Sequence, residues 1–159
     1  MRQLLTEIRN CTICAKHLPL GPRPVIEASE NSKIIIVGQA PGTKVHESRV
    51  PWDDQSGKKL REWLGVSSEL FYDVDKFGIV PMGFCYPGKG KTGDLPPRKE
   101  CAEAWHDKVF KSFRKVVLIL LVGTYAQEYF LRNDSRNLTE KVRNYSEYLP
   151  EFWPMPHPS

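Results

Sequence analysis

The chain has 159 residues, of which 40% are apolar and 26% are charged. This length and balance fit one globular domain covering residues 1–159, with a sizeable core, and argue against a two-domain chain. The net charge of +4 permits nucleic acid as a partner but does not require one.

The N-terminal segment lacks the apolar stretch of a secretory signal. Leu4, Leu5 and Ile8 instead recur at helical spacing between charged residues, which predicts an amphipathic helix over residues 2–10. The longest apolar run, residues 116–122, is far shorter than the roughly 20 residues that a membrane span needs. We therefore expect a cytoplasmic protein that does not enter a membrane.

A strand and a helix are expected next. The β-branched run at residues 33–37 ends at Gly38 and is typical of a strand buried on both faces, so we expect it at the centre of a sheet. Residues 55–64 predict a helix that ends at Gly65. The apolar side of this helix carries Leu60, Trp63 and Leu64.

The middle of the chain repeats the order of strand and helix. Residues 77–82 predict a second strand, weakened by Pro81, which cannot donate a hydrogen bond to a neighbouring strand. A loop over residues 86–98 then leads into a helix that includes Cys101 and Trp105.

A third strand and helix follow. Residues 116–122 predict a strand, Gly123 a turn, and residues 124–132 a helix, whereas residues 133–148 are polar and show no clear periodicity. The expected buried set of this helix is Tyr125, Tyr129 and Phe130.

The alternation of strands and helices predicts an α/β fold with a parallel sheet and helices on its faces. Ligands of such sheets bind beyond the carboxyl ends of the strands. That rule directs attention to residues 38–42, to residues 83–93 and to the end of the chain beyond Trp153.

Residues 38–42 read Gly-Gln-Ala-Pro-Gly and follow the first strand directly. Two glycines that flank a proline allow a tight loop whose backbone N–H groups face an anion or the polar edge of a base. On composition alone, an ordinary strand-to-helix turn is an equal alternative.

This loop, with Pro51-Trp52, Ser56-Gly57 and Leu60 after it, resembles the first motif of uracil-DNA glycosylases of the iron–sulfur class. In that class the pattern is Gly-Glu-Ala/Gly-Pro-Gly, Pro-Phe and Gly-x-x-Leu. The last three residues, His157-Pro158-Ser159, resemble the start of the superfamily's second catalytic motif. The resemblance covers nearly the whole chain and implies a three-layer α/β/α fold around a mostly parallel sheet of four strands.

The resemblance also implies roles for single residues. Trp52 stands where the family places the aromatic ring that stacks on the extruded base, and His157 resembles the histidine that stabilises negative charge on the departing base. Gln39 replaces the water-activating glutamate of the class; it cannot act as a general base, but its amide can hold a water. The expected substrate contacts are Gly38, Ala40, Pro41, Gly42, Trp52, Asp53 and Ser159.

The chain departs from the class at three points. Glu47, Asp53 and Asp54 are candidates for the missing carboxylate, and electrostatic stabilisation without a general base is the alternative. Residues 80–84 contain no counterpart of the asparagine that reads uracil, which puts uracil specificity in doubt. Relatives continue beyond the position of Ser159 into a loop and a final helix, and we expect their absence to weaken duplex binding.

The absence of an export signal argues against a disulfide framework for the four cysteines. Cys11 and Cys14 lie within chelating reach of one metal, and Cys85 and Cys101 flank a loop that is able to complete a four-thiolate site. The pattern resembles that of the iron–sulfur glycosylases and implies a structural 4Fe–4S cluster. Structural zinc and four reduced cysteines without metal are the alternatives.

Basic residues near the expected ligand face are candidates for contacts with DNA phosphates, and a solvated surface is the alternative for each. These candidates are Lys58, Lys89, Lys91 and Arg98. Our leading hypothesis is a monomer that hydrolyses the N-glycosidic bond of uracil or another damaged base in single- or double-stranded DNA. The alternative is a catalytically impaired DNA- or nucleotide-binding module of the same fold.

Overall fold

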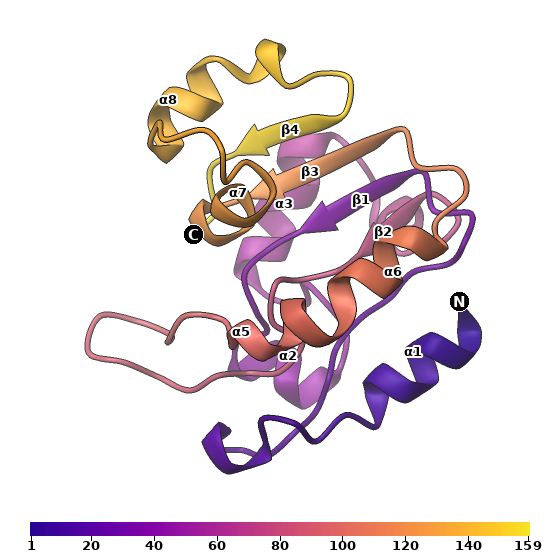
Figure 1. Ribbon diagram of the computed structural model, residues 1–159, viewed down its shortest axis with the longest axis vertical. Helices are drawn as coiled ribbons and strands as arrows, with labels where there is room; N and C mark the ends of the chain where they lie inside the picture. The colour runs from indigo at the N-terminus through magenta and orange to yellow at the C-terminus, as the bar shows by residue number, and fades with distance from the viewer.

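Strand β1, Ile34–Val37, occupies an inner position in a four-stranded sheet with the order β2-β1-β3-β4. The computed structural model describes residues 1–159 (Figure 1). Strand β1 pairs in parallel with β2, Phe77–Ile79, and with β3, Leu118–Val122; the edge strand β4, Phe152–Met155, pairs in parallel with β3. The expected α/β fold and the central place of the first strand are confirmed, and all four strands are parallel.

Successive side chains of β1 enter two separate hydrophobic cores, one on each face of the sheet. Ile35 and Val37 belong to one core and Ile36 to the other, and all three are fully buried. Three helices cover the first face: α1 (Arg2–Arg9), α6 (Asp107–Ser112) and α7 (Thr124–Phe130). Two helices cover the second face: α3 (Gln55–Leu64) and α4 (Ser68–Phe71). This arrangement is the expected three-layer α/β/α fold (Figure 1).

Shorter elements connect the layers: η1 (Ala15–His17), α2 (Thr43–Ser48), α5 (Lys99–Cys101), η2 (Ala102–His106), α8 (Leu138–Arg143) and η3 (Tyr145–Glu147). Element η2 is a turn of π-helix, a rare form that often occurs at functional sites. It joins α5 to α6 in one continuous helix. No helix is long and apolar enough to cross a bilayer.

In two helices, the buried side chains differ from those that the apolar pattern of the sequence predicts. In α3, Leu60 is fully buried but Trp63 is 44% exposed, with the ammonium group of Lys59 5.7 Å from the centre of its ring. In α7, the buried side chains are Ala126 and Gln127. The three large rings expected there are half-buried at the rim of the core: Tyr125, Tyr129 and Phe130. Ala126 and Gln127 face the sheet, where the Gln127 amide donates to the Leu121 carbonyl of β3, and the large rings cover the sides of the helix.

Arg49, which ends α2, has a φ of 64° in the left-handed region and makes no ion pair. Glycine is the residue that suits this position, so we expect Arg49→Gly to stabilise the fold by about 0.5–1 kcal/mol. Lys44→Gly, an exposed change inside the same helix, should instead destabilise the fold by about 1 kcal/mol. Urea unfolding of the two variants measures both; a loss of stability in Arg49→Gly would contradict the expectation.

Candidate functional site

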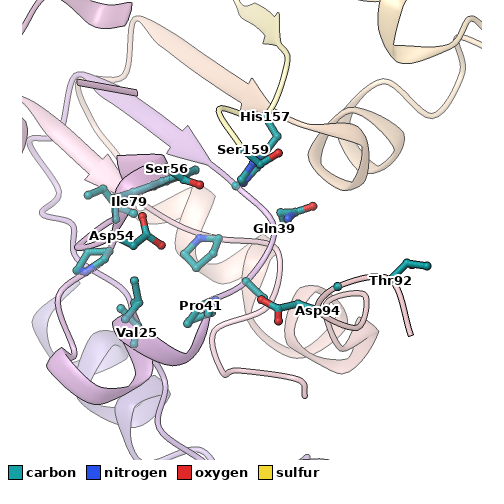
Figure 2. A pocket seen from close by; sticks show the side chains of 18 residues that line it. Val25, Gln39, Pro41, Asp54, Ser56, Ile79, Thr92, Asp94, His157 and Ser159 are labelled. Atoms are coloured by element: carbon teal, nitrogen blue, oxygen red, sulfur yellow. The ribbon is translucent and has the colours of Figure 1, made fainter. Parts of the chain in front are cut away.

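The three segments expected to bind a ligand meet in one pocket of about 440 Å³ at the carboxyl ends of β1 and β2 (Figure 2). The loop after β1 contributes all of residues 38–42, the 83–93 segment contributes Thr92 and Gly93, and the chain end contributes His157 and Ser159. The expected catalytic residues Gln39 and His157 line this pocket, together with the expected substrate contacts Gly38, Ala40, Pro41, Gly42, Trp52 and Ser159. Asp53 is exposed and lies outside the lining.

The first glycine of the loop is required by the tryptophan that faces it. A Cβ atom on Gly38 would lie 2.8 Å from Cζ2 of the Trp52 ring, which is closer than real side chains approach. The ring therefore lies directly against the backbone at the end of β1. The centre of the His157 ring is 5.7 Å from that of Trp52, at an interplanar angle of 33°. Trp52 is thus part of the pocket wall, and it also packs, partly buried, against the second hydrophobic core.

His157 follows β4 and packs against the turn after β3, where a Cβ atom on Gly123 would lie 3.5 Å from the Cβ of His157. Its Nδ1 is buried and has no hydrogen-bond partner within the protein. Burial lowers the pKa of His157, and the negative charge of Asp54 opposes that shift. The imidazole is therefore largely neutral near pH 7 and keeps one N–H to donate.

Of the three carboxylates proposed from the sequence, only Asp54 lines the pocket. Its Oδ1 accepts a hydrogen bond of 2.8 Å from the backbone N–H of Gly57 and thereby caps α3. The other oxygen remains available to a ligand (Figure 2). Glu47 and Asp53 are exposed and outside the lining.

A second pocket carboxylate, Asp94, was not among the candidates from the sequence. It lies one residue beyond the 83–93 segment, and its Oδ2 would be 3.5 Å from a Cβ atom on Gly42 (Figure 2). The sequence indicates Asp94 only weakly. It is an acidic residue that follows a glycine, in a loop that was expected to reach the ligand face.

The side chain of Gln39 forms no hydrogen bond within the protein, although its backbone oxygen accepts one of 2.8 Å from the N–H of Gly83. Gln39 thus lines the pocket with both the donor and the acceptor group of its side-chain amide free. Residues 80–84, where the class has its asparagine, contribute only Pro81 to the lining. The Pro81 carbonyl lies 3.0 Å from Nε2 of His106, a buried histidine of η2.

The four cysteines are free thiols that come from the N-terminal segment, the loop after β2 and α5. Burial raises the pKa of Cys14, that of Cys85 to about 11 and that of Cys101 to about 12. Charges on the other three cysteines also raise the pKa of Cys101, so the four lie near one another. No three His, Cys, Asp or Glu side chains are arranged to hold a single metal ion.

Each of the four sulfurs faces an N–H donor. The Trp105 indole donates to Cys11 over 3.4 Å, and the Phe84 backbone N–H donates to Cys101 over 3.5 Å. The Arg98 guanidinium lies beside Cys14, and the backbone N–H of Arg23 faces Cys85. N–H groups aimed at sulfur stabilise negative charge there, as the thiolates of a metal site require.

The expected phosphate contacts occupy different environments. Lys58, Lys89 and Lys91 are exposed. Lys89 and Lys91 belong to a hairpin loop, tied by a bridge between Lys89 and Asp94, whose neighbouring residues reach the pocket. Arg98 is half-buried and pairs with Glu100 at 2.6 Å beside Cys14, so its charge is engaged at the cysteines.

A pocket at the carboxyl ends of a parallel sheet, walled by a tryptophan and a neutral histidine, suits a planar ligand with a polar edge. The family model described as the uracil DNA glycosylase superfamily matches residues 26–159. The chain belongs to this superfamily. Its function is therefore of the DNA-glycosylase type, with DNA as the substrate.

Proposed function

We propose that the chain hydrolyses the N-glycosidic bond of uracil or another damaged base in DNA. The observation that carries this proposal is the meeting of Trp52, His157, Asp54 and the free amide of Gln39 around one pocket. Excision of a base needs an aromatic face for stacking, a donor for the charge on the departing base and a group that activates water. The pocket offers all three.

The reaction follows from these positions. An extruded base stacks on Trp52, and the bond between C1′ and the base nitrogen breaks with its electron pair going to the base. The N–H of His157 donates a hydrogen bond to the negative charge that develops there. A water held by the Gln39 amide forms a bond to C1′ through its oxygen and transfers a proton to the Asp54 carboxylate. The products are the free base and an abasic site.

The catalytically impaired binding module remains the second candidate, and two observations favour it. Gln39 stands in place of an acidic residue, and residues 80–84 provide no side-chain amide to read uracil. Such a module retains the base pocket, and its exposed lysines Lys58, Lys89 and Lys91 contact DNA phosphates. It binds DNA but does not cleave the N-glycosidic bond.

Alkali-coupled strand cleavage of single- and double-stranded DNA that contains one uracil tests the two candidates. Duplexes with hypoxanthine or an alkylated base widen the test to other lesions. Cleavage by the wild type that is lost in Gln39→Ala and His157→Ala supports the enzyme. A folded protein that binds these DNAs but cleaves none of them supports the binding module.

For a cofactor we propose a 4Fe–4S cluster bound by Cys11, Cys14, Cys85 and Cys101. The donor set fits, since four thiols with an N–H donor at each match the ligands of such a cluster. A single zinc ion needs all four sulfurs at a Zn–S distance of about 2.3 Å. A 4Fe–4S cluster is larger and therefore accepts thiolates that lie farther apart. When bound, it supplies a structural tie between the N-terminal segment and α5.

Protein purified without oxygen is expected to contain about four iron and four sulfide per chain. Cys85→Ser should lose this iron and unfold at lower urea, because coordination contributes folding energy. His17→Ala, a change of an exposed residue next to the N-terminal pair, should retain it. If the protein instead contains one zinc per chain, the site is a zinc site and not a cluster. Folded protein without metal would exclude both.

A further inference from the structure

The turn that carries Trp52 has an unusual backbone conformation. Trp52 has a φ of 59°, which places a bulky residue in the left-handed region that favours glycine. Conformations of this kind are strained and persist only where the surroundings enforce them. The groups that enforce this one lie behind the pocket, on α3 and next to α4.

Two hydrogen bonds fix the two carbonyls of the Pro51-Trp52 turn, and a third joins the two donor residues. Nη1 of Arg61 donates to the Trp52 carbonyl and to the Tyr72 hydroxyl oxygen, each over 3.1 Å. The Tyr72 hydroxyl in turn donates to the Pro51 carbonyl over 2.8 Å. Burial raises the pKa of Tyr72, so this hydroxyl keeps its proton and remains a donor.

The clamp formed by Arg61 and Tyr72 is itself held in place. The Arg61 guanidinium lies 5.1 Å from the ring centre of Phe71 and 5.6 Å from that of Tyr72. The rings of Phe71 and Tyr72 meet edge to face at 5.0 Å, and Phe71 is fully buried. A rigid core cluster therefore supports the two polar groups.

Gly57 closes the remaining space behind the turn. A Cβ atom there would lie 1.7 Å from the Trp52 carbonyl oxygen, so α3 begins in direct contact with the turn. Neither Arg61 nor Tyr72 lines the pocket. Their effect on a ligand must therefore pass through Trp52.

We propose that Arg61 and Tyr72 are positioning residues that hold the strained Trp52 turn, so that its indole forms a preset stacking platform for the extruded base. The stacking of a base on Trp52 is the part of this inference that rests on the proposed function. The geometry of the clamp is independent of it. Without the clamp the turn relaxes, the indole leaves Gly38 and the base loses one face of its site.

Fluorine NMR of protein labelled with 5-fluorotryptophan tests the clamp without any assay of activity. The chain has four tryptophans, and Trp52→Phe identifies the Trp52 resonance. We expect Tyr72→Phe and Arg61→Gln to shift or broaden this resonance and to leave that of Trp105 unchanged. An unchanged Trp52 resonance in both folded variants overturns the proposal.

Single-turnover excision provides the second readout. We expect Tyr72→Phe to lower the rate by about 10-fold or more, since misplacement of a positioning group by about 1 Å costs up to about 10²-fold. In a Trp52→Ala background the same change should have no further effect. If Tyr72→Phe lowers the rate by the same factor in the Trp52→Ala background, Tyr72 does not act through Trp52 and the proposal is overturned.

The control is a second tyrosine–arginine network far from the pocket. The Tyr148 hydroxyl accepts a hydrogen bond of 2.8 Å from Arg136, and Tyr148→Phe removes the same group from a similar setting. It should change neither the Trp52 resonance nor the rate. If the wild type excises no base, the proposed function fails, while the fluorine spectra still decide the clamp.

Discussion

Asparagine in place of Asp54 is expected to slow base excision by a factor of about 10²–10⁴, the contribution of one general base. The change removes the group that takes the proton from the attacking water. It leaves the fold intact, because an asparagine oxygen also accepts the 2.8 Å bond from Gly57 and caps a helix as well as aspartate does. Single-turnover kinetics measure the rate, and urea unfolding shows that stability is retained.

Asp53→Asn is the matched control, since the structure places this neighbouring carboxylate outside the pocket. Its rate should equal that of the wild type. A normal rate in Asp54→Asn would contradict the assignment, and Asp94→Asn then shows whether the other pocket carboxylate takes the proton. If neither change slows excision, the reaction proceeds by electrostatic stabilisation without a general base.

The sequence was most informative where local geometry permits only one residue type. Gly38 must lack a side chain because the Trp52 ring lies against it, and Gly57 because the Trp52 carbonyl does. Both glycines belong to the pattern from which the pocket was expected. The β-branched run of β1 similarly indicated the centre of the sheet, since three consecutive isoleucines suit a strand buried on both faces.

Features that depend on distant packing were not predictable in this way. Strand β4 contains Pro154 and follows a polar segment, and it is a strand because β3 offers a free edge. Asp54 lines the pocket and Asp53 does not, because the turn before α3 directs these two neighbouring side chains differently. Asp94 reaches the pocket only because a long loop folds back across the end of β1.

Acidification is expected to destabilise the fold by about 3 kcal/mol through His106 alone. This histidine is 1% exposed between the rings of Phe84 and Tyr129, each with its centre 5.6 Å away. Its Nε2 lies 3.0 Å from the Pro81 carbonyl oxygen, while its buried Nδ1 has no partner. A proton on Nδ1 would be an unsatisfied donor in an apolar site, so burial lowers the pKa of His106 from 6.5 to about 4.

The direction of the effect follows from the two pKa values. Between pH 6.5 and about 4 the unfolded chain has a protonated His106 and the folded chain does not. The unfolded state then binds more protons, so stability falls as the pH falls through this window. The slope is at most about 1.4 kcal/mol per pH unit, and the full stability contribution is present above pH 6.5.

His106→Gln isolates this contribution, because glutamine keeps an N–H for the Pro81 carbonyl but does not titrate. His46 and His157 also have lowered pKa values and add to the acid loss in both proteins. The measured quantity is therefore the difference in unfolding free energy between wild type and variant from pH 7.5 to pH 4. It should shift in favour of the variant by about 2–3 kcal/mol as the pH falls. A difference that does not vary with pH would show that His106 has the same pKa in the folded and unfolded states, which would contradict the lowered pKa.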